Sequence, residues 1–501
     1  DWSAQSAEVL RAQIRGGEAL MDGRLMPAAP GLSTFYMQRG DRLAWSGPSG
    51  PGAQADVLHR IVERADEDGL SPAVYQASAI GQRLLSWRKG DAAHRTLRDL
   101  VELDLLLSNA FLLYGSHLLR GRVDPRTVHD FWEAPYVQGG IADLLQTALD
   151  LQRVGPALDQ LRPPQRGYEN LQHALRRYRT IAASGGWPSV RPQGEGLRAR
   201  LEMSGDWSSG SSQRDALYRF QKRRHLDPNG LLDEDTLAAL NRPIAEQIAQ
   251  IEINMERWRW LPHDVDARYL LVRLDDYAVD MVSGGQRVHT ARAIVGSEFW
   301  RTPIFSARMT EVVVNPYWYV PRSIAVAEIL PILQQDPAYL ERSGIFLSRG
   351  EGMQARSVNP QQVRWSQLSA ADFDYRFTQK PGGSNPLGKV KLVFANPYSI
   401  YVHDTPNQQL FERAKREFSH GCIRVEDSLL LSAMVLDGWS EAALEDLVER
   451  GENRRIALAK PLPVFVLYWT AWVDMDGLLH LREDAYQSDA ALRSALRKIR
   501  F

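Results

Sequence analysis

The hydrophobic pattern of this chain changes its period near Pro262, and that change limits the folds open to it. Before Pro262 apolar residues recur every three or four positions, as on one face of a helix, most clearly at Leu100, Leu103, Leu107, Phe111, Tyr114 and Leu118. After Pro262 apolar and polar residues alternate, as on strands with one buried face. A chain of 501 residues can also hold two to four separate cores. We therefore predict a multidomain α+β protein, helical first and β-rich later.

The helical part divides at the breaker run GGWP, residues 185–188. We predict a helical scaffold domain over 1–195 and a small three-helix module over 196–242, in which Asp233 caps the third helix. Apolar residues at helical spacing then predict a linking helix within 243–264.

The alternating part predicts one β-rich domain over 265–490 and a tail over 491–501. Its expected strands are 269–272, 278–282, 288–295, 311–314, 390–394, 399–402, 456–458 and 463–473. Helical and loop patterns return between 321 and 386. We interpret that stretch as an insertion into the β domain, with a subdomain at about 322–385.

Composition excludes some classes of function. With 60 basic and 61 acidic residues, no global field attracts nucleic acid or anionic lipid. The apolar stretch from Leu105 to Leu119 is interrupted by polar residues and is shorter than the roughly 20 residues that span a bilayer. We predict a buried helix there. The chain starts at Asp1 without Met, so we expect a processed or trimmed chain, and one cysteine in so long a chain fits an oxidising compartment.

The single cysteine, Cys422, cannot serve an internal disulfide. Gly421 before it allows the backbone to approach a ligand closely. A helical pattern over 426–436 follows, and a helix N-terminus there would favour the thiolate. We interpret Cys422 as a nucleophile; the alternative is a buried cysteine that acts as a small hydrophobic residue.

His403 is the candidate base for this thiol, because it ends the predicted strand 399–402 and the loop over 404–418 is long enough to bring Cys422 beside it. Backbone N–H groups of residues 420–422 would stabilise an oxyanion. Arg424 would bind a substrate carboxylate or form a salt bridge. A zinc site with His403, His420 and Cys422 as ligands is a competing interpretation, but no fourth ligand is identified.

These residues form a recognisable combination. His403, fifteen intervening residues and the run SHGCIR at 419–424 closely resemble the signature of L,D-transpeptidases with a YkuD catalytic domain. Other segments resemble YcbB-type murein L,D-transpeptidases of Gram-negative bacteria: NPYWYVP at 315–321, QKPG at 379–382, NPLG at 385–388 and YVHDTP at 401–406. Residues 103–125 resemble the helical scaffold of that group, and residues 216–241 resemble a peptidoglycan-binding module.

The resemblance implies roles for particular residues. Cys422 would be the nucleophile and His403 its base, with the carbonyl or the carboxylate of Asp404 orienting the ring. Ser419, His420 and Gly421 would build the acyl pocket and oxyanion hole. The expected substrate contacts are Arg424, Tyr401 and Trp318, and the insertion would form a capping subdomain over the site. No metal or organic cofactor is implied.

The implied reaction is transfer of a peptidoglycan stem peptide from a tetrapeptide donor to an acceptor stem, through a thioester on Cys422, with release of D-Ala and formation of a 3→3 cross-link. Carbapenems are expected to acylate the same thiol. Alternatives keep the thioester but pass it to water or to a lipoprotein lysine, and a non-catalytic wall-binding scaffold is a further alternative. Expected partners are stem peptides and other cell-wall synthesis enzymes. The expected location is the periplasm, with inner-membrane attachment through a segment outside this chain.

Overall fold

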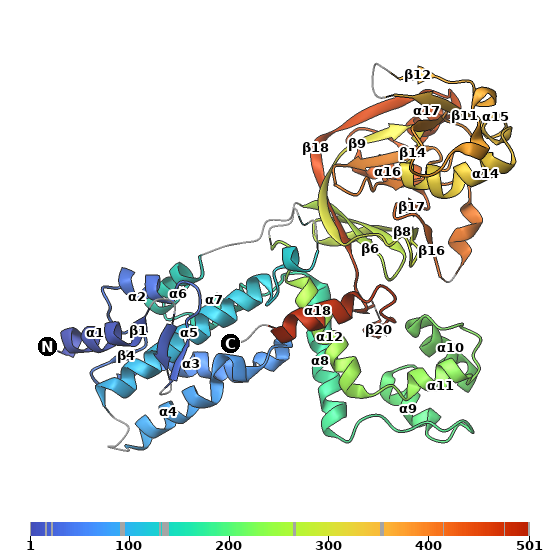
Figure 1. Ribbon diagram of the computed structural model, residues 1–501. Helices are drawn as coiled ribbons and strands as arrows, with labels where there is room; N and C mark the ends of the chain where they lie inside the picture. The colour runs from blue at the N-terminus through green and yellow to red at the C-terminus, as the bar shows by residue number, and fades with distance from the viewer. Residues whose placement is uncertain are drawn as a thin grey trace. The chain divides into compact units, whose positions relative to one another are not determined.

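The computed structural model of the chain describes residues 2–15, 18–21, 24–90, 96–129, 132, 140–263, 267–350, 355–413, 415–474 and 476–498. The chain forms two compact units (Figure 1). Unit 1 contains residues 1–130, 134–264 and 469–501, and unit 2 contains residues 131–133 and 265–468. Unit 1 is mainly helical and unit 2 is built on a β-sheet, so the predicted multidomain α+β class is confirmed.

Unit 1 follows the predicted helical periodicity. Its first part contains α1 (Trp2–Gln13), α2 (Leu32–Gln38), α3 (Ala53–Glu63), α4 (Ala77–Lys89), α5 (Leu97–Arg120), α6 (Ile141–Asp150), α7 (Val154–Asp159) and α8 (Arg166–Ala183), with short strands β1 (Ile14–Arg15), β2 (Glu18–Met21) and β3 (Arg24–Pro27). Helix α5 begins at a capping box between Thr96 and Asp99. Its middle is buried almost all round, as predicted for the apolar stretch from Leu105 to Leu119. No helix among the described residues is long and apolar enough to cross a membrane.

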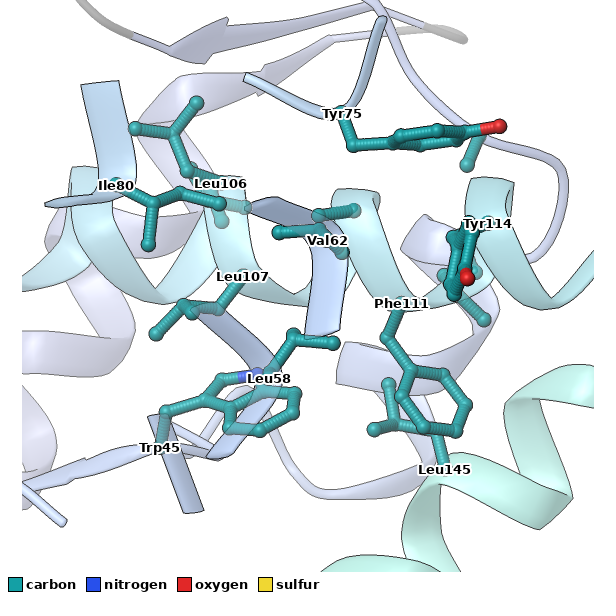
Figure 2. Close-up of a cluster of buried hydrophobic side chains, with 14 of the residues drawn as sticks. Trp45, Leu58, Val62, Tyr75, Ile80, Leu106, Leu107, Phe111, Tyr114 and Leu145 are labelled. Carbon is teal, nitrogen blue, oxygen red and sulfur yellow. The ribbon is translucent and has the colours of Figure 1, made fainter. Parts of the chain in front are cut away.

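The core of this first part surrounds α5. Figure 2 shows side chains from separate elements meeting on it: Leu58 and Val62 from α3, Ile80 from α4, Leu145 from α6, and Leu106, Leu107, Phe111 and Tyr114 from α5 itself. All of these side chains are nearly or fully buried. Burial of each large apolar side chain stabilises the fold by about 1.5–3 kcal/mol, so α5 organises this part of the chain.

Residues 196–242 fold as three short helices, as predicted: α9 (Leu197–Ser204), α10 (Gln213–Arg224) and α11 (Glu234–Leu240). They have a small core of their own, which includes Leu201, Leu217 and Phe220. Asp233 caps α11 by accepting a 2.8 Å hydrogen bond from the Thr236 N–H.

The predicted border at 490 is wrong, because residues 469–490 do not belong to the β-rich unit. Strands β19 (Ala471–Val473) and β20 (Leu479–Leu481) pair only with each other among the described residues, and with α18 (Ser488–Lys498) they lie in unit 1. Helix α12 (Ile244–Trp258) holds them there. Its Gln250 donates to the carbonyls of Thr470 and Arg482, and its Arg257 pairs with Asp489 at 2.5 Å. The expected linker and the expected tail are therefore packed parts of the helical unit.

Unit 2 is a nine-stranded mixed sheet in the order β16-β8-β17-β15-β14-β9-β18-β6-β7, and β7 also pairs with β8, so the sheet closes on itself. Its strands are β6 (Arg268–Arg273), β7 (Ala278–Ser283), β8 (Gln286–Gly296), β9 (Phe305–Val314), β14 (Val390–Phe394), β15 (Val402–His403), β16 (Glu417–Ser419), β17 (Ile423–Val425) and β18 (Arg454–Leu467). Strands β7 and β8 are joined by a tight hairpin turn at Gly284 and Gly285, both at positive φ. Helices α16 (Ser428–Val435) and α17 (Glu441–Glu449) precede β18.

Two local predictions around the site are wrong. A strand is expected at 399–402, but the observed strand contains only Val402 and His403. The residues before it are not extended, because Ser399 has φ 56° and the Asn396 side chain accepts hydrogen bonds from the N–H groups of Tyr398 and Ile400. The helix expected at 426–436 begins only at Ser428, after strand β17. Cys422 therefore precedes a strand, and the helix N-terminus proposed to favour its thiolate is not beside it.

The predicted insertion between β9 and β14 forms a subdomain with its own sheet, in the order β10-β13-β11-β12. These strands are β10 (Trp318–Tyr319), β11 (Ile345–Arg349), β12 (Arg356–Ser357) and β13 (Tyr375–Gln379), with short helices α13 (Arg322–Ile324), η5 (Ala325–Ile329), α14 (Leu330–Gln335) and α15 (Tyr339–Arg342) between β10 and β11. A separate core includes Leu333, Trp365 and Phe377. Because β10 pairs with β13, this capping subdomain begins at Trp318, earlier than the predicted residue 322.

A buried carboxylate connects several helices of unit 1. Asp68, which is 1 % exposed, accepts hydrogen bonds from the hydroxyls of Tyr114 on α5 and Tyr168 on α8, at 2.7 and 2.9 Å. It also pairs with Arg162 at 3.0 Å, and Arg162 contacts the exposed Asp159 as well. Removal of one member of a buried, hydrogen-bonded ion pair leaves the other unpaired.

We predict that Asp68→Asn lowers the free energy of unfolding of unit 1 by on the order of 3 kcal/mol. The matched control is Asp159→Asn, which removes the exposed partner of the same arginine and should change stability by less than about 0.5 kcal/mol. Hydrogen exchange of peptides from α5 and α8 in denaturant, read by mass spectrometry, measures both variants. Equal effects of the two substitutions would contradict the structural role given to Asp68.

Candidate active site

Two very short strands bring the predicted site residues together. Strand β15 pairs in parallel with β17, with Val402 opposite Ile423 and His403 opposite Arg424. The Ile423 N–H donates to the Tyr401 carbonyl at 3.1 Å, so Cys422 lies level with Tyr401. Because side chains alternate along a strand, the buried Val402 and Ile423 face the core of the unit, and the side chains on either side of them face the opposite way. Tyr401, His403, Cys422 and Arg424 therefore share one face.

The tautomer of His403 follows from its hydrogen bond. Its Nδ1 lies 2.5 Å from the carbonyl oxygen of Asp404. A carbonyl oxygen can only accept, so Nδ1 carries the proton and Nε2 keeps a lone pair. The Asp404 carboxylate binds elsewhere: it accepts from the Lys389 N–H at 2.8 Å and from Gln408 at 3.2 Å. Of the two ways that Asp404 was expected to orient the ring, the structure contains the one through the carbonyl.

The turn before Cys422 is shaped by Ser419 and Gly421. The Ser419 hydroxyl donates to the Cys422 carbonyl at 2.5 Å and accepts from the Gly421 N–H at 3.1 Å. Gly421 has φ 103°, which L side chains rarely adopt. Thr302, from the segment before β9, donates its hydroxyl to the Gly421 carbonyl at 2.8 Å. Ser419 therefore holds the turn, and Thr302 is a supporting residue that sequence analysis missed.

This arrangement changes the expected set of oxyanion donors. Of the three N–H groups of residues 420–422, that of Gly421 is already bonded to Ser419. The N–H groups of His420 and Cys422 have no hydrogen-bond partner within the part of the chain that the structure describes. Those two donors are the ones open to a ligand oxygen.

Burial decides the charge state of the pair. It raises the pKa of the Cys422 thiol above its ordinary value, against the opposing effects of hydrogen bonds from the Tyr401 N–H and hydroxyl and of the positive charges of Lys391 and Arg424. Burial, with the charges of Arg424 and Lys391, lowers the pKa of His403 to about 3. At neutral pH the site therefore contains a thiol and a neutral imidazole rather than a thiolate and an imidazolium.

Lys391 on β14 is a further member of the site that sequence analysis missed. It is the antiparallel register partner of His403, and its Nζ lies 3.8 Å from the centroid of the Tyr401 ring. Burial lowers the pKa of Lys391, and the nearby sulfur acts in the opposite direction. A lone charge in the apolar run 390–394 was the signal that could have revealed it.

The His420 side chain contacts the capping subdomain. Its Nε2 contacts the Glu328 carboxylate on η5, and its ring lies 5.4 Å from that of Trp300, measured between centroids. The other predicted contact, Trp318, lies on strand β10 of the cap sheet. Among the described residues it forms no hydrogen bond, ion pair or ring contact with the other predicted site residues. Nothing local in the sequence identified Glu328.

The zinc interpretation is not supported by the geometry. It required His403, His420 and Cys422 as one ligand set, but His420 is occupied by Glu328. No group of three or more His, Cys, Asp or Glu side chains in the described ranges is placed to hold a metal ion.

Comparison with known families places this site in context. Residues 267–443 match the family model of the YkuD L,D-transpeptidase catalytic domain. This range contains all the residues of the candidate active site. Residues 267–443 therefore resemble an L,D-transpeptidase catalytic domain. Residues 30–175 match the model of the scaffold domain, which agrees with the predicted helical scaffold. The resemblance to YcbB-type L,D-transpeptidases is thereby confirmed.

A curated relative agrees with this assignment. The chain is 30 % identical over 248 residues to a Haemophilus influenzae protein named "Putative L,D-transpeptidase". The match covers 49 % of each chain, so the protein spans about half the length of the curated relative it matches.

The neutral state of the Cys422–His403 site makes a testable prediction. The rate of Cys422 alkylation by iodoacetamide should keep rising with pH through pH 8, because burial places the pKa of this thiol above that of a free cysteine, about 8.5. Mass spectrometry of the modified chain between pH 5 and pH 10 measures the profile. A rate that is already constant from pH 5 to pH 7, and that His403→Ala then makes pH-dependent, would instead indicate a preformed thiolate–imidazolium pair.

Proposed function

We propose that this protein is a peptidoglycan L,D-transpeptidase that forms 3→3 cross-links by acyl transfer through Cys422. The observation that carries the proposal is the shared face of β15 and β17. It combines a half-buried thiol, an imidazole with a free Nε2 and two cations. Nucleophilic acyl transfer needs these groups together.

In the first step Cys422 attacks the carbonyl of the L,D bond after the third residue of a donor tetrapeptide. His403 Nε2 accepts the thiol proton as the C–S bond forms, because burial disfavours a resting ion pair. The oxyanion would be stabilised by the N–H groups of His420 and Cys422. The imidazolium then protonates the departing amine, and D-Ala leaves.

In the second step the side-chain amine of another stem peptide attacks the thioester. His403, neutral again, accepts the proton from this amine, and the thiol is released as the new amide bond forms. His403 then passes this proton to the departing sulfur. The imidazole is therefore neutral before and after each step, and the whole cycle begins and ends with the thiol and the neutral imidazole, so no proton is gained or lost.

The acceptor distinguishes this proposal from its closest alternative. Water as the acceptor would make the protein an L,D-carboxypeptidase or endopeptidase, and a lipoprotein lysine would make it an anchoring enzyme. We favour the stem amine because the inserted subdomain, with its own core, contacts the catalytic turn through Glu328 and His420. Such a wall beside the thioester helps to exclude water. We propose the periplasm as the location, because the proposed substrate is peptidoglycan.

The test is digestion of purified muropeptides with the full chain. We expect 3→3 dimers and free D-Ala by mass spectrometry. Cys422→Ala should abolish both while its melting temperature stays within a few degrees of wild type, because a half-buried thiol fills little core volume. Tripeptides without dimers would contradict cross-linking and support hydrolysis.

A carbapenem adduct tests the nucleophile separately from the acceptor. Intact-mass measurement should show one adduct on the wild type and none on Cys422→Ala. No adduct on the wild type, or an equal adduct on Cys422→Ala, would support the non-catalytic wall-binding scaffold.

A further inference from the structure

Lys391 is the charged side chain of an otherwise apolar strand, β14. Antiparallel register partners point to the same side of a sheet, so Lys391 and His403 share a face. The Lys391 ammonium lies 3.8 Å from the Tyr401 ring centroid, and Tyr401 lies level with Cys422 across the β15–β17 pair. The ammonium is therefore directed into the site and does not extend along the surface of the unit.

Neither Lys391 nor Arg424 has an acidic partner. Within the described residues no carboxylate lies within ion-pair distance of either side chain, and the Arg424 Nε is buried without a hydrogen-bond partner. Glu311, the acid that Lys391 senses electrostatically, is bonded to Arg455 through Oε2 at 3.0 Å. Two partly buried cations without a counter-ion are unfavourable in the folded state unless another group uses them.

The Cys422 sulfur does not act as the counter-ion of Lys391 and Arg424. Both cations favour the thiolate, but burial outweighs them and leaves the Cys422 thiol with a pKa above its ordinary value. Near neutral pH the sulfur is therefore uncharged, and two positive charges face a site that contains no anion.

We propose that Lys391 and Arg424 form an anion-binding site beside Cys422 that takes a carboxylate of the donor substrate. The identity of that carboxylate rests on the proposed function. In a donor that ends one residue after the scissile bond, the terminal carboxylate belongs to the leaving residue and lies next to the reacting carbonyl. A longer donor presents a neutral amide at that position. Lys391 is then a specificity-determining residue that favours donors ending there.

The anion site is tested without turnover by alkylation. Iodoacetate and iodoacetamide are similar in size and differ in charge, so the ratio of their rates at Cys422 reports the local positive potential. Lys391→Met should lower the iodoacetate-to-iodoacetamide ratio roughly 3- to 10-fold, while Lys391→Arg should largely retain it. The control is Lys380→Met: Lys380 also stacks on a ring, that of Phe346, but lies on the cap without a link to the sulfur.

An unchanged ratio in Lys391→Met, or an equal fall in Lys380→Met, would overturn the anion site. Melting curves show whether Lys391→Met is folded, and Lys391→Arg keeps the test valid if it is not. In that case loss of the iodoacetate preference in Lys391→Arg, which keeps the charge, would count against the site.

Turnover tests which carboxylate is bound. The wild type should process a tetrapeptide donor with a free terminal carboxylate at least roughly tenfold better, in kcat/KM, than the same donor with a terminal carboxamide. In Lys391→Met this preference should shrink mainly through a higher KM for the carboxylate donor. Turnover with the preference unchanged in Lys391→Met would refute the anion site and leave the proposed function standing. A charge-dependent alkylation ratio without turnover of either donor would refute the proposed function and leave the anion site standing.

Discussion

The parallel pairing of β15 with β17 is the constraint on which the rest of the site depends. The two strands contain only two and three residues, yet their register sets the order of the face: Tyr401 level with Cys422, and His403 level with Arg424. A shift of one residue would move every side chain of β17 to the opposite face of the sheet. The buried Val402 and Ile423 prevent such a shift, because they would have to exchange places with polar groups.

The side chains on that face differ in charge and therefore in role. His403 is buried and neutral, and the Asp404 carbonyl sets its tautomer, so its lone pair lies on Nε2. Lys391 and Arg424 keep the face positive without forming internal ion pairs. A half-buried neutral thiol beside two cations suits a reaction with an anionic substrate, because the substrate would then supply the counter-charge.

The capping subdomain is coupled to this face through one turn. Glu328 contacts His420, and His420 directly precedes the glycine whose carbonyl Thr302 holds. The cap core is separate from the sheet, so the subdomain is an independently packed body that contacts the catalytic turn at a polar point. The Glu328–His420 contact is partly exposed and contributes little stability, which fits a wall that, under the proposed function, has to admit two large peptides in succession.

The sequence by itself determined the α+β division, the helices around α5, the three-helix module and the choice of Cys422 and His403 as the candidate reacting pair. Hydrophobic periodicity, helix caps such as Asp233 and a compact sequence motif predict those features. Each of these signals depends on residues that are close together in the chain. Only the tertiary structure decided that residues 469–498 return to the helical unit, that a strand rather than a helix follows Cys422, and that Lys391 and Glu328 belong to the site. These features depend on which distant segments lie side by side. Buried charges in particular are stabilised or destabilised by groups far away in sequence, so no local pattern could reveal them.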